Sequence, residues 1–465
     1  MKKGLIIMLS DTIAAVATGY SSAGISVIRI SGLKALEIAD RIFLPEDKTA
    51  LIDSKGYRAH FGSIVYKGEI LDEGIALVMR MPHSYTGEDT VEISCHGGPL
   101  VTKRVLEAVI GSGAMPAEPG EFTKRAFLNG KLDLAEAEAV AELIASKNDH
   151  ARKESVSQLK GRLSEKICKI RNDLLDDAAY IEAALDDPEH IELDGFSAGL
   201  KERLIPVKEL LFGLIKDFDT GRQLMEGIKT VILGKPNAGK SSLINLFTGH
   251  DMAIVTEIAG TTRDILTEQV SFNGISFEMT DTAGIRDTKD IVEKIGVERS
   301  IESAENADLI LYVVDSSTPI GDEDKKVLEI VRNRKVIVVY NKTDLDPKTS
   351  LNDIKKLVGD APVIPFSAKD GADIHIITDK MTEMFVSGTI GSSDQVIITN
   401  LRHKKEVETA IEAIDAVIKG IDEGFSEDLL AIDLNEAISA LGRILGISVD
   451  DDIINRVFEK FCMGK

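Results

Sequence analysis

The sequence predicts a multidomain fold: an α+β N-terminal domain, a discontinuous α-helical bundle, and an α/β domain inserted into that bundle. Strand-like runs dominate the first quarter of the chain, and apolar residues at helical spacing lie on both sides of a central segment. That central segment alternates apolar runs with helix-like stretches, which is typical of an α/β domain. The expected domains are residues 1–130, 131–221, 222–388 and 389–465.

The composition is that of an ordinary globular protein, with 43% hydrophobic and 28% charged residues among 465. The net charge of −22 argues against broad non-specific binding to nucleic acid or anionic membranes, but it allows an RNA substrate held by a local patch. Three widely spaced cysteines predict a reducing cytoplasm without a disulfide framework. No apolar run reaches the roughly 18 residues of a membrane span, and the apolar stretch at 5–9 is too short for a secretion signal.

The N-terminal region is interpreted as an α+β domain with one helix at residues 33–43. Cys95 and His96 are adjacent within or beside its last strand, where neighbouring side chains point to opposite faces. We therefore expect a core cysteine beside a loop histidine, and not a nucleophile with its base. The expected strands are residues 13–17, 24–30, 59–66, 74–81 and 90–94.

Helical periodicity returns on both sides of the central domain. Because each helix exposes an apolar stripe that needs a partner, we expect the two flanking sets to pack together around an insertion. Two separate bundles are the alternative. Residues 388–395 are small and polar and are expected to form a hinge. The expected helices are residues 132–143, 163–185, 204–218, 407–421, 434–445 and 453–461.

The central domain contains a glycine-rich loop that predicts phosphate binding. Residues 234–241 read GKPNAGKS, between an apolar run and a helix-like segment. The glycines let backbone N–H groups turn inward around phosphates, and Lys240 is expected to reach the β- and γ-phosphates. The Ser241 hydroxyl is expected to bind Mg²⁺. The alternative is a glycine-rich turn that holds no ligand.

Three later motifs predict that the nucleotide is GTP: residues 281–284 read DTAG, residues 341–344 read NKTD and residues 367–369 read SAK. Asp281 is expected to hold the magnesium and Gly284 to sense the γ-phosphate. The Asp344 carboxylate suits guanine, whose ring N1–H and exocyclic amine are donors that adenine lacks. Together the motifs predict a Ras-like P-loop GTPase domain.

The loop at residues 256–264 lies between the first two motifs, and Thr262 is expected to close over Mg²⁺ there. We expect the nucleotide to contact this loop and all four motifs. The expected GTP-binding residues are Asn237, Ala238, Gly239, Lys240, Ser241, Ser242, Thr256, Glu257, Ile258, Ala259, Gly260, Thr261, Asp281, Thr282, Ala283, Gly284, Asn341, Lys342, Asp344, Ser367, Ala368 and Lys369.

Further specific stretches lie mostly outside the nucleotide motifs: DTIAA at 11–15, VIRISG at 27–32, YTGED at 85–89, HGGP at 96–99, PGEFTKRAFLN at 119–129, KLDLA at 131–135, AGTTRD at 259–264 and CMGK at 462–465. With them, nearly the full length of the chain resembles the MnmE (TrmE) family of tRNA modification GTPases. The family tail usually reads CIGK. Met463 in place of isoleucine conserves volume and apolar character, so we expect function to be retained.

The resemblance implies a folate-binding N-terminal domain through which the protein forms a homodimer. It implies that the protein acts with the flavoprotein MnmG, in a heterotetramer-type complex, at the 5-position of wobble uridine in certain tRNAs. An aminomethyl-type (carboxymethylaminomethyl) group is added there, with a 5,10-methylene or 5-formyl tetrahydrofolate as the implied one-carbon donor. The residues implied to contact the folate are Arg29, Glu92, Lys131 and Lys465.

The residue after the DTAG motif is Ile285, where Ras-type enzymes carry a glutamine that orients the attacking water. We therefore expect Asn237 to ligate K⁺ beside the phosphates, as the resemblance also suggests, with K⁺-dependent pairing of two GTPase domains. Glu293 is expected to orient the water, so the expected catalytic residues are Glu293, Asn237 and Lys240. Asn237 as a simple turn residue is the alternative. The other expected K⁺ ligands are Thr256, Thr261 and the backbone carbonyl of Ile258.

Two other classes of function are alternatives to a tRNA-modifying enzyme. A GTPase switch in ribosome assembly commonly carries basic RNA-binding appendages, which this acidic chain lacks. A membrane-remodelling stalk requires a basic amphipathic or apolar insertion segment, and none is present. Binding of a reduced folate separates the tRNA-modifying enzyme from a GTPase switch.

Overall fold

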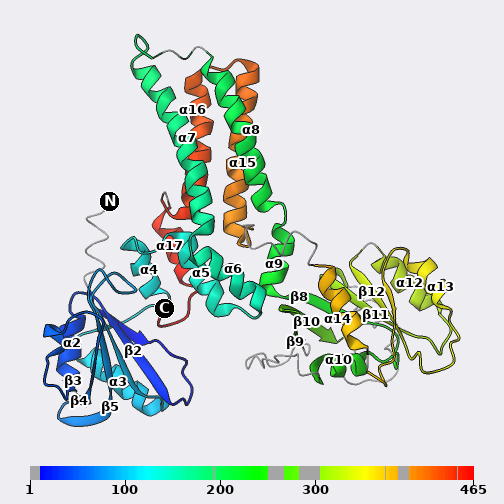
Figure 1. The fold of residues 1–465 in the computed structure, drawn as a ribbon, viewed down its shortest axis with the longest axis horizontal. Coiled ribbons are helices and arrows are strands. Elements are labelled where there is room, and N and C mark those ends of the chain that lie inside the picture. The colour runs from blue at the N-terminus through cyan, green and yellow to red at the C-terminus, as the bar shows by residue number, and fades with distance from the viewer. Residues whose placement is uncertain are drawn as a thin grey trace. The chain divides into compact units, whose positions relative to one another are not determined.

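The computed structural model describes residues 11–191, 193, 195–249, 267–281, 304–332, 334–371, 373–385, 397–447 and 449–465 (Figure 1). The chain divides into two compact units. One comprises residues 1–144, 156–207 and 408–465, and the other comprises residues 145–155 and 208–407. The hinge expected at 388–395 lies outside the described residues, and the three boundaries between the four domains expected from the sequence stay predictions.

A seven-stranded sheet forms the N-terminal part of the first unit, in the order β3-β4-β5-β6-β2-β1-β7. Neighbouring strands are antiparallel except for the parallel pair β1 and β7. The period-two alternation of β2 buries Ile28 and Ile30 on one face and places Arg29 between them on the other. The strands are β1 Ile13–Val16, β2 Ile25–Ser31, β3 Phe43–Pro45, β4 Arg58–Tyr66, β5 Glu69–Met79, β6 Thr90–His96 and β7 Met115–Pro116.

Helices α2 (Ala35–Ile42) and α3 (Pro99–Gly111) contribute to the core of this sheet, together with a short 3-10 helix, η1 (Leu51–Asp53). Ile38 of α2 and Val105 of α3 belong to one buried cluster with the apolar residues of β2, β5 and β6. The five strands and the helix predicted from the sequence are therefore confirmed, with ends shifted by a few residues. Helix α3 was not predicted.

The helices that flank the α/β domain in the sequence pack together. Helix α7 (Arg162–Asp186) contacts α16 (Glu427–Leu445), and the predicted apolar stripe of α7 is buried except for Leu185, which is exposed. The prediction that the two flanking sets pack together is confirmed by this contact, whereas residues 145–155, 208–221 and 397–407 of the flanking segments belong to the second unit. The other helices of this region are α4 Glu121–Leu128, α5 Leu134–Ala145, α6 Asp149–Leu159, α15 Leu401–Glu423 and α17 Asp451–Phe458.

The helix predicted at 204–218 is wrong at both ends. Helix α8 spans Phe196–Ile215 with Pro206 inside it, and a separate helix, α9, spans Phe218–Glu226. The ring of Phe196 stacks on Tyr180 of α7, with ring centroids 4.9 Å apart. This tertiary contact stabilises the first turn of α8, and apolar spacing alone does not reveal it.

The second unit contains a six-stranded sheet in the order β13-β12-β11-β8-β10-β9, parallel except for the antiparallel edge strand β9. The strands are β8 Ile228–Leu233, β9 Thr267–Phe272, β10 Ile275–Asp281, β11 Leu309–Asp315, β12 Val336–Asn341 and β13 Val363–Pro365. Among the described residues, the helices between the strands are α10 Lys240–Gly249, α12 Asp322–Val331 and α13 Leu351–Val358, and α14 Ile374–Glu383 follows β13.

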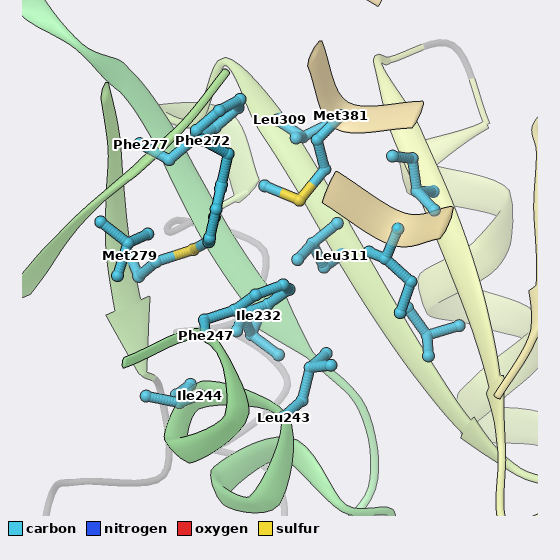
Figure 2. Close-up of a cluster of buried hydrophobic side chains, with 14 of the residues drawn as sticks. Ile232, Leu243, Ile244, Phe247, Phe272, Phe277, Met279, Leu309, Leu311 and Met381 are labelled. Carbon is cyan, nitrogen blue, oxygen red and sulfur yellow. The ribbon is translucent and has the colours of Figure 1, made fainter. Parts of the chain in front are cut away.

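Both faces of this sheet are buried, as expected for a parallel sheet with helices on each side. On one face Ile232 of β8 packs in a cluster with Phe247 of α10 and Met381 of α14 (Figure 2). On the other face Val231 of β8 packs in a cluster with Leu328 of α12 and Ile354 of α13. The carboxyl ends of the parallel strands therefore meet at one edge, where α/β sheets bind ligands.

Candidate functional site

The glycine-rich loop joins β8 to α10 at this edge of the sheet. The Lys240 side chain is buried, and its Nζ donates to the backbone oxygens of Gly234 at 2.7 Å and Lys235 at 2.8 Å. The Lys235 oxygen also accepts from the Ala238 N–H at 3.2 Å, which closes the loop. The loop thus curls around the lysine at the N-terminal end of α10, the arrangement of a phosphate site.

Asn341 joins three of the predicted motifs. Its Nδ2 donates to the backbone oxygen of Ala238 at 2.7 Å, and its Oδ1 accepts from the Ala368 N–H at 3.0 Å. A Cβ at position 239 would lie 2.1 Å from Asn341 Nδ2, so only glycine admits this amide. The glycine-rich loop, the NKTD motif and the SAK motif are therefore brought together.

The residues predicted to recognise the base lie beside this amide. Ser367 Oγ donates to Asp344 Oδ1 at 3.1 Å, and Thr343 Oγ1 donates to the backbone oxygen of Phe366 at 3.0 Å. Asp344 is exposed, as is Lys369. These contacts fix the two loops against each other and orient the carboxylate that the sequence assigns to guanine.

Asp315 at the end of β11 belongs to the same edge and was not predicted. Lys342 Nζ lies 2.6 Å from Asp315 Oδ2. Burial alone would raise the pKa of the Asp315 carboxyl, but hydrogen bonds from Lys342 and Ser317 hold it below its usual value. Its position at the end of the apolar run 309–314 was the only sequence signal.

Several predicted nucleotide residues lie outside the described part of the chain. Asp281 ends β10, and its backbone pairs with Ile232 near the end of β8, so the DTAG motif begins beside the glycine-rich loop. Ser241 and Ser242 lie exposed in the first turn of α10. The predicted residues outside the described ranges are Thr256, Glu257, Ile258, Ala259, Gly260, Thr261, Thr262, Thr282, Ala283, Gly284 and Glu293.

A second group of predicted residues meets in the first unit. Arg29 of β2 pairs with Glu92 of β6, where Nε of the arginine donates to Glu92 Oε1 at 2.8 Å. The guanidinium carbon of Arg29 lies 5.3 Å from the ring centroid of Tyr85 and 5.4 Å from that of Phe122. Arg29 therefore has both a charge partner and two aromatic contacts. Neither aromatic residue was assigned a role from the sequence.

The C-terminal tail reaches this group. Arg29 Nη1 donates to the backbone oxygen of Gly464 at 3.4 Å, and Lys465 Nζ lies 5.8 Å from the Tyr85 ring centroid. A Cβ at position 464, where φ is +87°, would lie 2.2 Å from the backbone oxygen of Val16, so this turn requires glycine. Burial lowers the pKa of Lys465 and Arg29 lowers it further, while Glu92 opposes both.

Lys131, the fourth residue of the predicted folate set, contacts a neighbouring loop. Its Nζ donates to the backbone oxygen of Pro82 at 3.0 Å, in the loop that leads to Tyr85. The tail itself is anchored by Phe458 and Phe461, which pack with Leu134 and Val140 of α5. Arg29, Glu92 and Lys465 are thus brought together, and Lys131 lies against the loop that carries Tyr85.

Cys95 and His96 point to opposite sides, as predicted, although His96 is the last residue of β6 and does not lie in a loop. Cys95 is buried, whereas the His96 side chain is 75% exposed and its Nδ1 lies 2.8 Å from Asp72 Oδ1. Burial, followed by the nearby Asp72 carboxylate, raises the pKa of the Cys95 thiol to about 11. Cys95 is therefore a core residue and not a nucleophile.

This assignment predicts how the cysteines react. At pH 8 only about one Cys95 thiol in a thousand is ionised, and the thiolate is the reactive form. Iodoacetamide is expected to label the exposed Cys168 and Cys462 in the native protein and to label Cys95 only after unfolding. Peptide mass spectrometry checks this, and labelling of native Cys95 at a rate similar to Cys168 would contradict it.

Within the described ranges, no group of three or more histidine, cysteine, aspartate or glutamate side chains is arranged to hold a metal ion. Nor is any helix of the described part of the chain long and apolar enough to cross a membrane.

A glycine-rich loop lies between a parallel strand and a helix, with the NKTD motif hydrogen-bonded to the loop and the SAK motif hydrogen-bonded to the NKTD motif. This arrangement defines the class of P-loop GTPases. Two family models match this chain: the GTP-binding protein TrmE N-terminus over residues 12–131 and the MnmE helical domain over residues 134–462. The chain belongs to the MnmE family of tRNA modification GTPases.

Its relatives align over almost their whole length. The tRNA modification GTPase MnmE of Lachnoclostridium phytofermentans is 50% identical over 98% of this chain and 100% of the relative. The MnmE of Acetivibrio thermocellus is 43% identical over 98% of this chain and 99% of the relative. Among solved structures, the G domain of the T. maritima FeoB iron transporter covers 34% of this chain and 99% of its own at 27% identity, with a low TM-score of 0.27.

Proposed function

We propose that this chain uses GTP hydrolysis to drive modification of the wobble uridine of certain tRNAs. As a member of its family it is a GTPase of tRNA modification. The observation that carries the proposal is the bridging amide of Asn341, which joins the phosphate loop to the base-recognition loops. We further propose that the protein acts with MnmG in a heterotetramer-type complex to add a carboxymethylaminomethyl-type group at the 5-position.

The roles at the nucleotide site follow from the residue types. Asp344 accepts hydrogen bonds from guanine, and the backbone N–H groups of residues 237–241 bind the phosphates. Lys240 would exchange the carbonyls of Gly234 and Lys235 for the β- and γ-phosphates. Ser241 and Thr262 would hold Mg²⁺, which when bound supplies positive charge at the phosphate oxygens.

Hydrolysis itself would depend on two further residues. Glu293 would orient the attacking water, and Asn237 would ligate K⁺ with Thr256, Thr261 and the carbonyl of Ile258. The ion would supply charge beside the β- and γ-phosphates and favour pairing of two GTPase domains. The support in the described residues is the backbone of Asn237, whose φ of +61° places it at the turn of the phosphate loop. A turn residue without an ion would adopt the same conformation.

We propose that the Arg29 group binds a 5,10-methylene or 5-formyl tetrahydrofolate. Two cations, Arg29 and Lys465, suit the carboxylates of a folate tail, and the Tyr85 ring offers a surface on which a pterin can stack. Glu92 can accept hydrogen bonds from pterin amino groups, and Lys131 would approach from the neighbouring loop. Aromatic faces beside a few placed charges are typical of the residues that line cofactor sites.

Replacing Arg29 with alanine is expected to abolish binding of 5-formyltetrahydrofolate while leaving GTP hydrolysis nearly intact. The substitution removes the charge that Glu92, Tyr85 and the tail surround. Titration calorimetry measures the binding. Arg58→Ala is the matched control, because this arginine lies on β4 of the same sheet and is exposed.

A wild-type protein that gives no binding heat with the reduced folate would favour the alternative, a GTPase switch without one-carbon chemistry. Three further parts of the proposal remain. A homodimer formed through the N-terminal domain rests on the resemblance to the family. The domain bounds 1–130, 131–221, 222–388 and 389–465 rest on the sequence patterns, and a cytoplasmic location rests on the three widely spaced cysteines.

A further inference from the structure

Residues 315–324 run from the end of β11 to the start of α12. They contact both halves of the nucleotide site, which are the NKTD motif on the base side and the glycine-rich loop on the phosphate side. We name them the 315–324 segment. An aspartate lies at each end, Asp315 and Asp324, and each forms an ion pair with a lysine of a nucleotide motif. The segment is therefore placed to hold the two halves at a fixed separation.

On the base side, the segment is bonded to the NKTD motif through three interactions. Asp315 pairs with Lys342, the Ser316 N–H donates to the Asn341 backbone oxygen at 3.0 Å, and Ser316 Oγ donates to the Lys342 backbone oxygen at 2.9 Å. These contacts fix the loop from which Asn341 reaches the phosphate loop.

On the phosphate side, Asp324 of α12 binds the glycine-rich loop through the side chain of Lys235. Its Oδ2 lies 2.5 Å from Lys235 Nζ and accepts from the Gly321 N–H at 2.9 Å, while its Oδ1 accepts from Tyr312 OH at 2.8 Å. The Asp324 side chain is only 7% exposed. A buried carboxylate with several donors of this kind is held in one orientation.

Lys235 is the residue whose backbone oxygen accepts from both Lys240 Nζ and the Ala238 N–H. The side chain and the carbonyl of Lys235 therefore have different partners. The ammonium pairs with Asp324 of α12, and the carbonyl accepts the hydrogen bonds that close the phosphate loop. Movement of the Lys235 side chain would be transmitted to the backbone around Lys240.

We infer that Asp324 is a positioning residue for nucleotide binding, which acts on the phosphate loop through Lys235. The inference rests on the proposed GTP site. It specifies that Asp324 contributes to affinity through the β- and γ-phosphates and not through the base. The competing role is a purely structural one, because Asp324 also accepts the N–H of Gly321 at the start of α12.

The two roles differ in how they affect GDP and GMP. GMP lacks the β-phosphate that the loop and Lys240 would hold, so a positioning residue should affect GDP more strongly. Asp324→Asn is expected to raise the Kd of GDP about tenfold and that of GMP less than about twofold. Displacement of a fluorescent guanine nucleotide measures both values in the full-length protein.

Asp322→Asn is the matched control, since Asp322 lies in the same helical turn, is 90% exposed and pairs with Lys325. It should leave both dissociation constants within about twofold of the wild type. Lys235→Met gives a second test that leaves the start of α12 intact. It should reproduce the selective loss for GDP, and the double variant should be no weaker than either single variant.

Three outcomes would overturn the inference and leave the proposed GTP site standing. They are equal losses of affinity for GDP and GMP, additive effects in the double variant, or unchanged GDP binding in Lys235→Met. A wild-type protein that binds no GDP would overturn the inference together with the proposed GTP site. If Asp324→Asn does not fold, Lys235→Met decides the question, because its side chain is one-third exposed.

Discussion

Asp344→Asn is expected to lower the affinity for GTP by about a hundredfold and to let xanthine nucleotides compete. The Asp344 carboxylate would accept two hydrogen bonds from guanine, and its Oδ1 is oriented by Ser367 Oγ at 3.1 Å. The amide of asparagine presents a donor where guanine requires an acceptor, whereas xanthine offers an oxygen at that position. Hydrogen bonds to charged groups contribute about 1.5–3 kcal/mol each, so the loss of such a pair has a large effect.

Nucleotide competition measures this effect, with labelled GTP displaced in turn by GTP, XTP and ATP. Asp346→Asn is the matched control, because Asp346 is exposed and follows closely in the same loop. Its preference for guanine should be that of the wild type. If Asp344→Asn keeps the wild-type preference as well, the carboxylate does not read the base.

The wild-type protein is expected to hydrolyse GTP at least about tenfold faster in KCl than in NaCl, and Asn237→Ala is expected to remove the difference. The physical reason is that Ile285 cannot orient water as the neutral glutamine of Ras-type enzymes does. The negative charge that develops between the β- and γ-phosphates also requires a positive charge, which K⁺ at Asn237 would supply. Glu293→Ala should slow turnover and spare GTP affinity, because its proposed role is to orient water.

Single-turnover hydrolysis at matched ionic strength separates the specific cation from general screening. Asn245→Ala, at an exposed position of α10, is the matched control and should retain the potassium effect. Equal wild-type rates in the two salts would contradict the cation mechanism and would leave Asn237 as a turn residue with a positive φ.

Local motifs made much of the nucleotide site predictable. The loop at 234–241 and the NKTD and SAK motifs are each contiguous in the sequence, so their residue types and spacing alone indicate their chemistry. The central α/β sheet followed from buried apolar runs such as 336–340, and the flanking bundle followed from the stripe of α7. These features depend on neighbouring residues, which a sequence pattern records directly.

The missed features depend on contacts between distant residues. Nothing in the sequence pairs Asp324 with Lys235 or Asp315 with Lys342, since a lone aspartate near a helix start is usually a cap. Tyr85 and Phe122 were visible only as parts of longer stretches, and their roles depend on the position of Arg29 close to both rings. The early start of α8 depends on the Tyr180–Phe196 stack in the same way.

Coupling of a GTPase site to one-carbon chemistry on tRNA requires both proposed sites of this chain to act together. Mass spectrometry of wobble-position nucleosides tests this coupling. The tRNA comes from a strain that lacks the protein, and from the same strain carrying the wild-type, Lys240→Ala or Arg29→Ala protein. We predict that the carboxymethylaminomethyl-type uridine disappears in the deletion strain and returns only with the wild-type chain. A full level of that nucleoside in the deletion strain would contradict the proposed function.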